Sequence, residues 1–359
     1  MKILSLGLDN KILDVSSAVA KRAIFVGERL EKYLIVVPGK NNETQLAPKV
    51  KSIGISGANK LLTLKNIYNF LNKLLKKEKF DLLTVQDTAY LACLGAVIAK
   101  RFGLKLELQV HGFEKNKFLR KYLFKRAVKR ADKIRTVSHR LADKLIKDYK
   151  IDKEKIYVLP VFVGKERIVK EKTQINLKQK YPGYFIFLTV SRLVPVKNIA
   201  LQIQALAKLP KEEKIKLIVV GDGPQRQELM ELAVKLKVKD RIEFALWQED
   251  LAGFYQTADC FLLSSDSEGY GVAVAEAIVA GLPVIMTDVG CAGYLTENEK
   301  NALIVPVANL DLFTQAMERV VKDRDLSAKL ATNSQFFAQK IASQEELRQT
   351  TINNWQSIL

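Results

Sequence analysis

The feature of the sequence that most constrains its fold is an alternation of short apolar runs, rich in β-branched residues, with segments of helical periodicity. Strands are expected in the first half at 2–6, 33–37, 82–85, 104–110 and 133–137, with helices at 61–76 and 90–102 between them. The pattern restarts in the second half, with strands at 184–190, 216–220, 242–245, 261–264 and 283–287. Helices at 199–209, 225–236, 251–257 and 272–280 separate those strands, and a last helix is expected at 344–357. Strands that alternate with helices predict parallel sheets.

Length and composition limit what those sheets belong to. At 359 residues the chain is long enough for two domains, each with its own core. We therefore predict an α/β protein with two Rossmann-like, doubly wound parallel-sheet domains at 1–165 and 181–339, joined near 159–180. No run reaches the roughly 18 apolar residues of a spanning helix, and the first apolar stretch is too short for a signal peptide. An odd number of widely spaced cysteines provides neither a disulfide framework nor a CxxC metal site. We expect a cytosolic protein with these three thiols: Cys93, Cys260 and Cys291.

The net charge of +19 belongs to the first half of the sequence. Residues 1–162 contain 34 Lys and Arg against 15 Asp and Glu, whereas the remainder contains 24 of each. The segment 115–150 alone has 14 basic and 3 acidic residues. Such asymmetry indicates an anionic partner of the first half rather than a particular fold. Nucleic acid, a phosphorylated acceptor and an anionic lipid surface all qualify.

Polar loops follow the predicted strands of the second half, and ligands of open parallel sheets bind beyond the carboxyl ends of the strands. Arg192 and Lys197 lie in the loop after 184–190, where two cations suit a pyrophosphate. The alternative is a solvated loop with no binding function. Gly221 and Gly223 follow 216–220 and permit a tight turn there, which is as consistent with a simple turn as with a site.

The segment 267–277 is the strongest functional signal in the sequence. Its glycines strip side chains from the turn before a helix, so that backbone N–H groups can donate to an anion or a sugar hydroxyl. Glu268 precedes this helix and Glu276 lies about one turn inside it, and two carboxylates can hold the hydroxyls of a sugar or ribose. A purely structural role for Glu276 is hard to credit, because an unpaired carboxylate in so apolar a helix is costly.

Together these loops resemble the nucleotide-sugar half of the two-Rossmann (GT-B) glycosyltransferases, specifically the large retaining family 4, also called glycosyl transferases group 1. The motifs are Ser-Arg-Leu at 191–193 with Lys197, Gly-Asp-Gly-Pro at 221–224, and Glu-Gly-Tyr-Gly at 268–271, where seven residues separate Glu268 from Glu276. Asp-Val-Gly at 288–290 and the segment 301–306 match the closing pattern of the family. The resemblance implies domains that face across a cleft and a last helix, 340–359, that packs back on the first domain.

The same resemblance implies the roles of individual residues. Arg192 and Lys197 would hold the donor diphosphate, Glu268 and the 269–271 backbone the transferred sugar, and Glu276 the ribose. His111, at the end of a predicted strand, would touch the donor sugar near the reacting carbon, although a capping or packed histidine is the alternative. We expect catalysis to involve His111, Glu268, Arg192 and Lys197. We expect the donor to contact Gly7, Arg192, Lys197, Gly221, Gly223, Glu268, Gly269, Tyr270, Gly271, Val272 and Glu276.

A basic stripe marks the first half. Apolar residues, Tyr122 among them, recur at helical spacing after 117, which predicts a packed helix with a solvated basic face. Like charges four residues apart repel by about 0.2–0.5 kcal/mol per pair, so a face of one sign also indicates an anionic surface. Each basic residue near an anionic leaflet contributes roughly 1 kcal/mol. The residues expected to meet a membrane are Lys117, Arg120, Lys121, Lys125, Arg126, Lys129 and Arg130.

The resulting hypothesis is a retaining glycosyltransferase, peripheral on the inner face of the cell membrane. It would move a sugar from a UDP- or GDP-sugar to the hydroxyl of a membrane glycolipid or polyprenyl-linked saccharide. Cations and a helix N-terminus would stabilise the leaving diphosphate, so no metal or other cofactor is expected, and Asp323 and Asp325 are expected at a helix cap. The alternatives are a nucleotide-sugar epimerase or phosphorylase on the same scaffold, or a basic nucleic-acid-binding protein. The latter is disfavoured because the basic helix lacks a stacking platform.

Overall fold

A computed structural model describes residues 1–359 except 113–117, 170–172 and 249. The protein divides into two compact units, each of which is described by itself. Unit 1 consists of residues 1–160 and 345–359, and unit 2 of residues 161–344. The last helix therefore belongs to the same unit as the N-terminus. No helix in the described ranges is both long and apolar enough to cross a bilayer.

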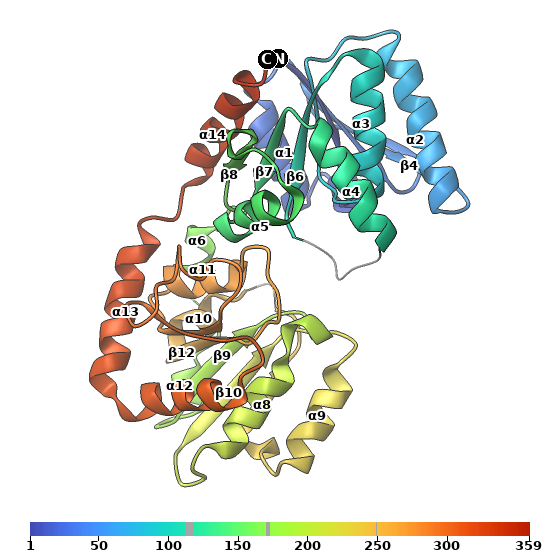
Figure 1. Ribbon diagram of the computed structural model, residues 1–359. Helices are drawn as coiled ribbons and strands as arrows, with labels where there is room; N and C mark the ends of the chain where they lie inside the picture. The colour runs from blue at the N-terminus through green and yellow to red at the C-terminus, as the bar shows by residue number, and fades with distance from the viewer. Residues whose placement is uncertain (113–117, 170–172, 249) are drawn as a thin grey trace. The chain divides into compact units, whose positions relative to one another are not determined.

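Unit 1 is built on an eight-stranded sheet (Figure 1). Its strands are β1 (Lys2–Leu6), β2 (Lys32–Pro38), β3 (Asn42–Ala47), β4 (Val50–Ile55), β5 (Leu82–Val85), β6 (Lys105–Val110), β7 (Lys133–Thr136) and β8 (Ile156–Val158). Their order is β3-β4-β2-β1-β5-β6-β7-β8, and all neighbours are parallel except β3 and β4. The five expected strands form within one residue of their expected ends. The hairpin β3–β4 and the short β8 were not expected from the sequence.

The helices of unit 1 cover both faces of this sheet. They are α1 (Ala18–Gly27), α2 (Lys60–Leu75), α3 (Tyr90–Phe102), α4 (Phe118–Arg130), α5 (His139–Tyr149) and α14 (Gln344–Gln356), with short 3₁₀ turns at Asn10–Leu13 and Lys153–Lys155. Helices α2 to α5 supply apolar side chains to one core, together with alternate residues of β1, β5 and β6. In Figure 1 α2, α3 and α4 lie side by side, and α3 packs against both neighbours.

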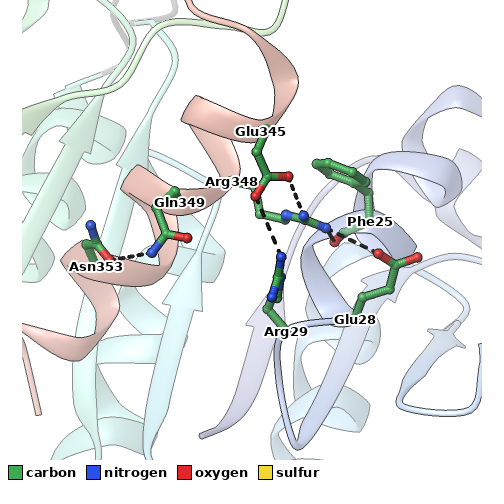
Figure 2. Close-up of polar contacts among 7 residues, drawn as sticks. All are labelled: Phe25, Glu28, Arg29, Glu345, Arg348, Gln349 and Asn353. Atoms are coloured by element: carbon green, nitrogen blue, oxygen red, sulfur yellow. Dashed lines mark hydrogen bonds and ion pairs between the residues drawn. The ribbon is translucent and has the colours of Figure 1, made fainter.

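The opposite face of the sheet is covered in part by α14. Arg348, whose side chain is 8% exposed, donates to the carbonyl oxygen of Phe25 at 3.1 Å and to the Glu28 carboxylate at 3.2 Å. Its guanidinium lies 3.9 Å from the centroid of the Phe25 ring and also pairs with Glu345 of its own helix (Figure 2). One to three turns further along, α14 and the residues after it pack into a small core with β1 and β5. Its members include Ile3, Leu82, Ile352, Trp355 and Ile358.

Unit 2 contains a six-stranded, wholly parallel sheet (Figure 1). Its strands are β9 (Phe185–Val190), β10 (Ile215–Val220), β11 (Ile242–Ala245), β12 (Cys260–Leu263), β13 (Val284–Thr287) and β14 (Ala302–Val305). The order β11-β10-β9-β12-β13-β14 reverses direction between β9 and β12. Such a switch point leaves a crevice at the carboxyl ends of the two strands, where open α/β sheets bind ligands. Five of the six strands were expected, and β14 was not.

The helices of unit 2 connect these strands and then continue to residue 338. They are α6 (Lys165–Ile168), α7 (Leu177–Lys180), α8 (Ile199–Lys208), α9 (Arg226–Lys235), α10 (Ala252–Thr257), α11 (Val272–Val279), α12 (Leu310–Lys322) and α13 (Arg324–Ala338), with 3₁₀ turns at Pro195–Lys197 and Lys239–Arg241. The core combines β9, β10, α8 and α12. Asp323 precedes α13 and its side chain accepts from the Leu326 amide, as expected of a cap.

Candidate functional site

The loops that follow β9 and β12 are joined to each other at the switch point of unit 2. The amide of Asp266 donates to the carbonyl oxygen of Val196 at 2.8 Å. The Ser264 hydroxyl donates to the carbonyl oxygens of Lys197 and Asn198 at 2.9 Å. Asn198 stands at the N-cap position of α8 with a φ of 46°, but its side chain does not cap the helix, because its amide nitrogen donates to Asp266 at 3.1 Å. These bonds hold the two loops as one surface.

A largely buried ion pair lies on this surface. The Lys197 Nζ is 2.5 Å from Glu268 Oε1, and the two side chains are 18% and 11% exposed. The Ser265 hydroxyl donates to the same carboxylate oxygen at 2.7 Å. The structure therefore brings together a cation expected to hold a diphosphate and an acid expected to hold a sugar. Arg192 is exposed on the same loop and makes no ion pair with a described residue, so the three groups sum to one net positive charge.

The glycines after β10 serve the packing of these loops. A Cβ on Gly221, whose φ is 139°, would lie 1.9 Å from the carbonyl oxygen of Ser191. A Cβ on Gly223 would lie 2.4 Å from the carbonyl oxygen of Leu193. The Leu193 amide in turn donates to the Asp222 carbonyl at 2.9 Å. These glycines therefore let two loops approach closely, and their expected contact with a donor stays a prediction.

The N-terminus of α11 completes the surface. Gly271 has a φ of 94°, which a residue with a side chain rarely adopts, and Val272 begins the helix. The amides of Val272 and Ala273 have no acceptor within the helix and point out of its end, whereas the Val274 amide donates to the Gly271 carbonyl oxygen at 3.0 Å. Gly290, with a φ of 58°, packs beneath the preceding turn, because its Cβ would lie 2.4 Å from the Tyr270 carbonyl oxygen and 2.9 Å from the Glu268 Cβ.

Glu276 lies half-buried on α11. Its carboxylate accepts from the Tyr255 hydroxyl at 2.8 Å. Burial raises the pKa of the Glu276 carboxyl, and the Tyr255 hydrogen bond and the charge of Arg167 offset only part of that shift. A partly dehydrated carboxylate with one neutral partner still has free acceptor capacity, which a pair of ribose hydroxyls can satisfy.

His111 lies in unit 1, directly after β6. Its Nδ1 is 3.4 Å from the Gln86 Nε2, in a contact whose donor depends on the tautomer. Partial burial of its ring, followed by the positive charge of Arg135, lowers the pKa of His111 to about 4, although the residue as a whole remains exposed. Both causes act in the same direction, so the imidazole is neutral at pH 7.

Gly7, also in unit 1, is buried directly after β1. Its amide donates to the Val36 carbonyl oxygen at 3.2 Å. The contact with a donor that was expected of Gly7 stays a prediction.

The basic helix of the first half is α4. Phe124, Ala127 and Val128 face the core, so Tyr122, which the apolar pattern placed among the packed residues, instead lies 48% exposed on the basic face. The Tyr122 hydroxyl accepts from Arg126 at 3.0 Å. Arg120 is half-buried with its guanidinium 5.9 Å from the Tyr90 ring centroid, and Lys117 lies outside the described residues. The exposed basic residues of the helix are Lys121, Lys125, Arg126, Lys129 and Arg130.

Some residues that support these sites were not predicted from the sequence. Gln202 is fully buried on α8 and donates to the Ser264 hydroxyl at 2.9 Å, so it supports the junction of the two loops from below. A glutamine within the apolar face of a predicted helix was the available signal. Gln86 was detectable only as a polar residue after a strand. Among the described residues, no three His, Cys, Asp or Glu side chains gather as a metal site.

Comparison with known proteins defines the class. Residues 170–336 match the family model of glycosyl transferases group 1, and residues 32–167 match that of glycosyltransferase family 4. The protein is a glycosyltransferase of this family 4 type with the GT-B fold, which confirms the family and the fold class expected from the motifs.

Three similar proteins are matched over 61% to 100% of their own length. An Escherichia coli UDP-Gal:alpha-D-GlcNAc-diphosphoundecaprenol alpha-1,3-galactosyltransferase is 28% identical over 72% of this chain and 70% of the relative. An N-acetyl-alpha-D-glucosaminyl L-malate synthase of Bacillus anthracis is 28% identical over 62% of this chain and 61% of the relative. The crystal structure of Anabaena HepE with UDP-glucose superposes with a TM-score of 0.80 over 99% of this chain and 100% of HepE. At 19% identity the HepE match supports the fold alone.

Proposed function

We propose that unit 2 binds a UDP- or GDP-sugar and that the protein transfers the sugar, with retention of configuration, to a hydroxyl of an acceptor bound by unit 1. The observation that carries this proposal is the Lys197–Glu268 pair beside the exposed Arg192 at the β9/β12 switch point. Arg192 and Lys197 supply cations for the diphosphate, Glu268 and the turn before α11 supply acceptors and donors for the sugar, and Glu276 supplies an acceptor for the ribose. The name of the E. coli relative, a UDP-galactose-dependent enzyme, supports this assignment.

Charge development on the diphosphate is the step that these residues serve. As the bond between the anomeric carbon and the diphosphate breaks, negative charge grows on the leaving oxygen. Arg192, Lys197 and the α11 amides provide fixed positive charge and dipoles there, which stabilises the transition state more than the ground state. Because these groups supply the stabilisation, we propose a transfer that needs no metal. The neutral His111 would contact the sugar as a hydrogen-bonding group rather than as a cation.

A matched set of ligand-binding measurements tests the donor proposal. Calorimetric titration with UDP, GDP and ADP should show micromolar to millimolar binding of one uridine or guanosine diphosphate. Lys197→Met should weaken that binding at least about tenfold, as expected for the loss of a charge-assisted contact. Lys208→Met, which removes an equally charged lysine from an exposed ion pair with Asp311 on the same unit, is the control. Equal binding by both variants would contradict the assignment of Lys197.

Turnover separates transfer from the rival reactions. Nucleoside diphosphate released only when an acceptor is present indicates transfer, whereas conversion of the nucleotide sugar without acceptor indicates an epimerase. Activity that survives exhaustive treatment with EDTA supports metal independence, and NMR of the product's anomeric proton reports retention. Salt-sensitive RNA binding without nucleotide-sugar affinity would favour the nucleic-acid alternative.

We further propose that α4 holds the protein on an anionic membrane, where a lipid-linked acceptor lies. Five exposed cations and the exposed ring of Tyr122 share one face of this helix. Lys and Arg attract acidic headgroups, and an aromatic ring suits the interface between headgroup and acyl region. Vesicles rich in phosphatidylserine should bind the protein, and Lys121→Gln with Lys125→Gln and Lys129→Gln should weaken that binding. Lys235→Gln with Lys237→Gln and Lys239→Gln, three charges of unit 2, is the control; equal loss in both triples would contradict the proposal.

A further inference from the structure

A row of polar side chains crosses one face of the sheet in unit 1. Thr84 of β5 is in register with Glu107 of β6, and Gln109 of β6 is in register with Arg135 of β7. Because successive side chains of a strand alternate between faces, Glu107, Gln109 and His111 lie on the same face of β6 or its extension. This row runs from the buried middle of the sheet to its carboxyl edge.

At the inner end of the row, the Glu107 carboxylate is closed to solvent and its hydrogen-bonding capacity is satisfied. Glu107 has no exposed surface, and its carboxylate accepts four hydrogen bonds. Thr84 and Gln109 donate to Oε2 at 2.5 and 3.0 Å, and the Tyr157 hydroxyl and the Trp355 indole, the latter at 3.1 Å, donate to Oε1. Burial, and then the neighbouring charge of Glu107, raise the pKa of Tyr157, which keeps that hydroxyl a donor. The carboxylate therefore needs no direct cation.

The outer end of the row carries a cation, the guanidinium of Arg135, with no ion-pair partner among the described residues. Arg135 is half-buried, and its only described hydrogen bond runs from Nη1 to the Gln109 Oε1 at a long 3.5 Å. Its Nε is buried without a partner, and no described carboxylate lies within ion-pair distance of its guanidinium. The same charge acts on the adjacent His111 and lowers its pKa. A guanidinium in this state retains most of its donor capacity.

We propose that Arg135, with Gln109 and His111 beside it, forms an oxyanion-binding site that anchors a phosphate or carboxylate of the acceptor. This inference rests on the proposed function for the identity of the ligand as acceptor, while the site itself stands on unit 1 alone. A guanidinium offers a planar fork that matches both phosphate and carboxylate, and the neutral His111 can add a ring N–H donor without competing charge. Gln109, whose side-chain N–H groups already donate to Thr84 and Glu107, orients Arg135 through its Oε1. The excess of positive charge in residues 1–162 raises the local concentration of such anions.

The competing explanation is that Arg135 only balances the charge of Glu107 through Gln109. The two explanations differ in what an added anion does. A charge-balancing arginine has no need of a further anion, whereas an anchoring arginine binds one saturably and in contact with His111.

The experiment follows the imidazole ring signals of His111 by NMR in the full-length protein labelled with ¹³C-histidine. The sequence contains only two histidines, so a His139→Asn variant assigns both sets of signals. Sodium phosphate and sodium succinate are titrated separately at pH 7.5, each against sodium chloride of matched ionic strength. Phosphate stands for a lipid-linked diphosphate and succinate for a carboxylate acceptor, so the arm that saturates identifies the source; saturation in either arm supports the site.

Two variants with the same change of charge decide the interpretation. Arg135→Gln should weaken saturation at least about tenfold, and Lys133→Gln, on the same face of β7 at its other end, should leave it unchanged. Arg135→Lys keeps the charge but loses the planar fork, so it should bind the anion less tightly than wild type. This variant replaces Arg135→Gln in the test if Arg135→Gln fails to fold. No saturable shift in either arm of the wild-type titration, or equal weakening by Lys133→Gln, would overturn the proposal. Because UDP affinity is measured separately, failure of this site and failure of the donor proposal remain distinguishable.

Discussion

The ion pair between Lys197 and Glu268 allows one prediction to be worked out in full. The Lys197→Met variant removes the cation and leaves Glu268, 11% exposed, with the Ser265 hydroxyl as its described partner. A hydrogen bond to a charged group contributes about 1.5–3 kcal/mol net. We therefore expect the free energy of unfolding of unit 2 to fall by about 2 kcal/mol. For a unit of about 180 residues, that loss lowers the Tm by about 4–8 °C.

The same variant should reduce catalysis to a much larger extent than its stability loss explains. Loss of one preorganised group that stabilises developing charge costs on the order of 10²-fold in kcat. At 25 °C a unit destabilised by about 2 kcal/mol remains almost wholly folded, since typical domains have about 5–15 kcal/mol of stability. Turnover measured at 25 °C, beside calorimetric melting, therefore separates the two effects.

Two further variants make the reasoning refutable. Glu268→Gln added to Lys197→Met removes the stranded charge, and it should recover at least half of the lost stability. Lys208→Met breaks an ion pair whose side chains are 48% and 78% exposed, and it should cost no more than about 0.5 kcal/mol. Equal losses from the two lysine substitutions, or no recovery in the double variant, would refute the argument from burial. Wild-type turnover in Lys197→Met would refute its catalytic part.

Three other expectations follow from single contacts. Burial raises the pKa of Glu276, so the wild type loses stability as pH rises through that pKa. The Tm of Glu276→Gln should therefore rise relative to the Tm of the wild type from pH 5 to pH 8. A Tm difference that shrinks as pH rises would contradict this. Trp355→Phe removes one of four donors to the buried Glu107 while keeping a ring, and urea unfolding should show a loss of about 1–2 kcal/mol. Gly290→Ala places a Cβ 2.4 Å from the Tyr270 carbonyl oxygen at a φ of 58°. We expect the free energy of unfolding to fall by about 2 kcal/mol and UDP binding to weaken. An unchanged Tm would show that the turn adjusts to the added Cβ.

Several of the strands that were predicted from the sequence are buried strands with an apolar composition. The central strands β1, β5, β9, β10 and β13 are apolar throughout or nearly so, because helices cover both faces of a parallel sheet. The missed β3 reads Asn-Glu-Thr-Gln-Leu-Ala and lies at an exposed edge, where it pairs only with β4. Its formation depends on that neighbour and not on its own pattern. The three-residue β8 depends in the same way on β7.

The site was predictable to the level of its loops but not of its contacts. Parallel topology alone places 191–198 and 264–271 at one edge of a sheet, given that β9 and β12 are neighbours. The bond between Lys197 and Glu268 joins residues 71 apart, and it depends on how the two loops fold toward each other. Glu107 shows the same limit. It was visible as a charge within an apolar strand, but one of its partners, Trp355, lies 248 residues further along the sequence.

The two units place their cations differently around a similar topology, and this difference argues for a division of labour. In each sheet the strand order reverses beside the first strand, between β1 and β5 in unit 1 and between β9 and β12 in unit 2. Unit 2 has Arg192 and Lys197 directly at its switch point, where we propose that the diphosphate binds. Unit 1 has a buried, occupied Gly7 amide there, and its unpaired Arg135 lies instead on β7, beside the strand that ends in His111. On the proposed function, the diphosphate of the donor therefore belongs to unit 2, whereas the oxyanion site proposed next to His111 suits a smaller anionic group.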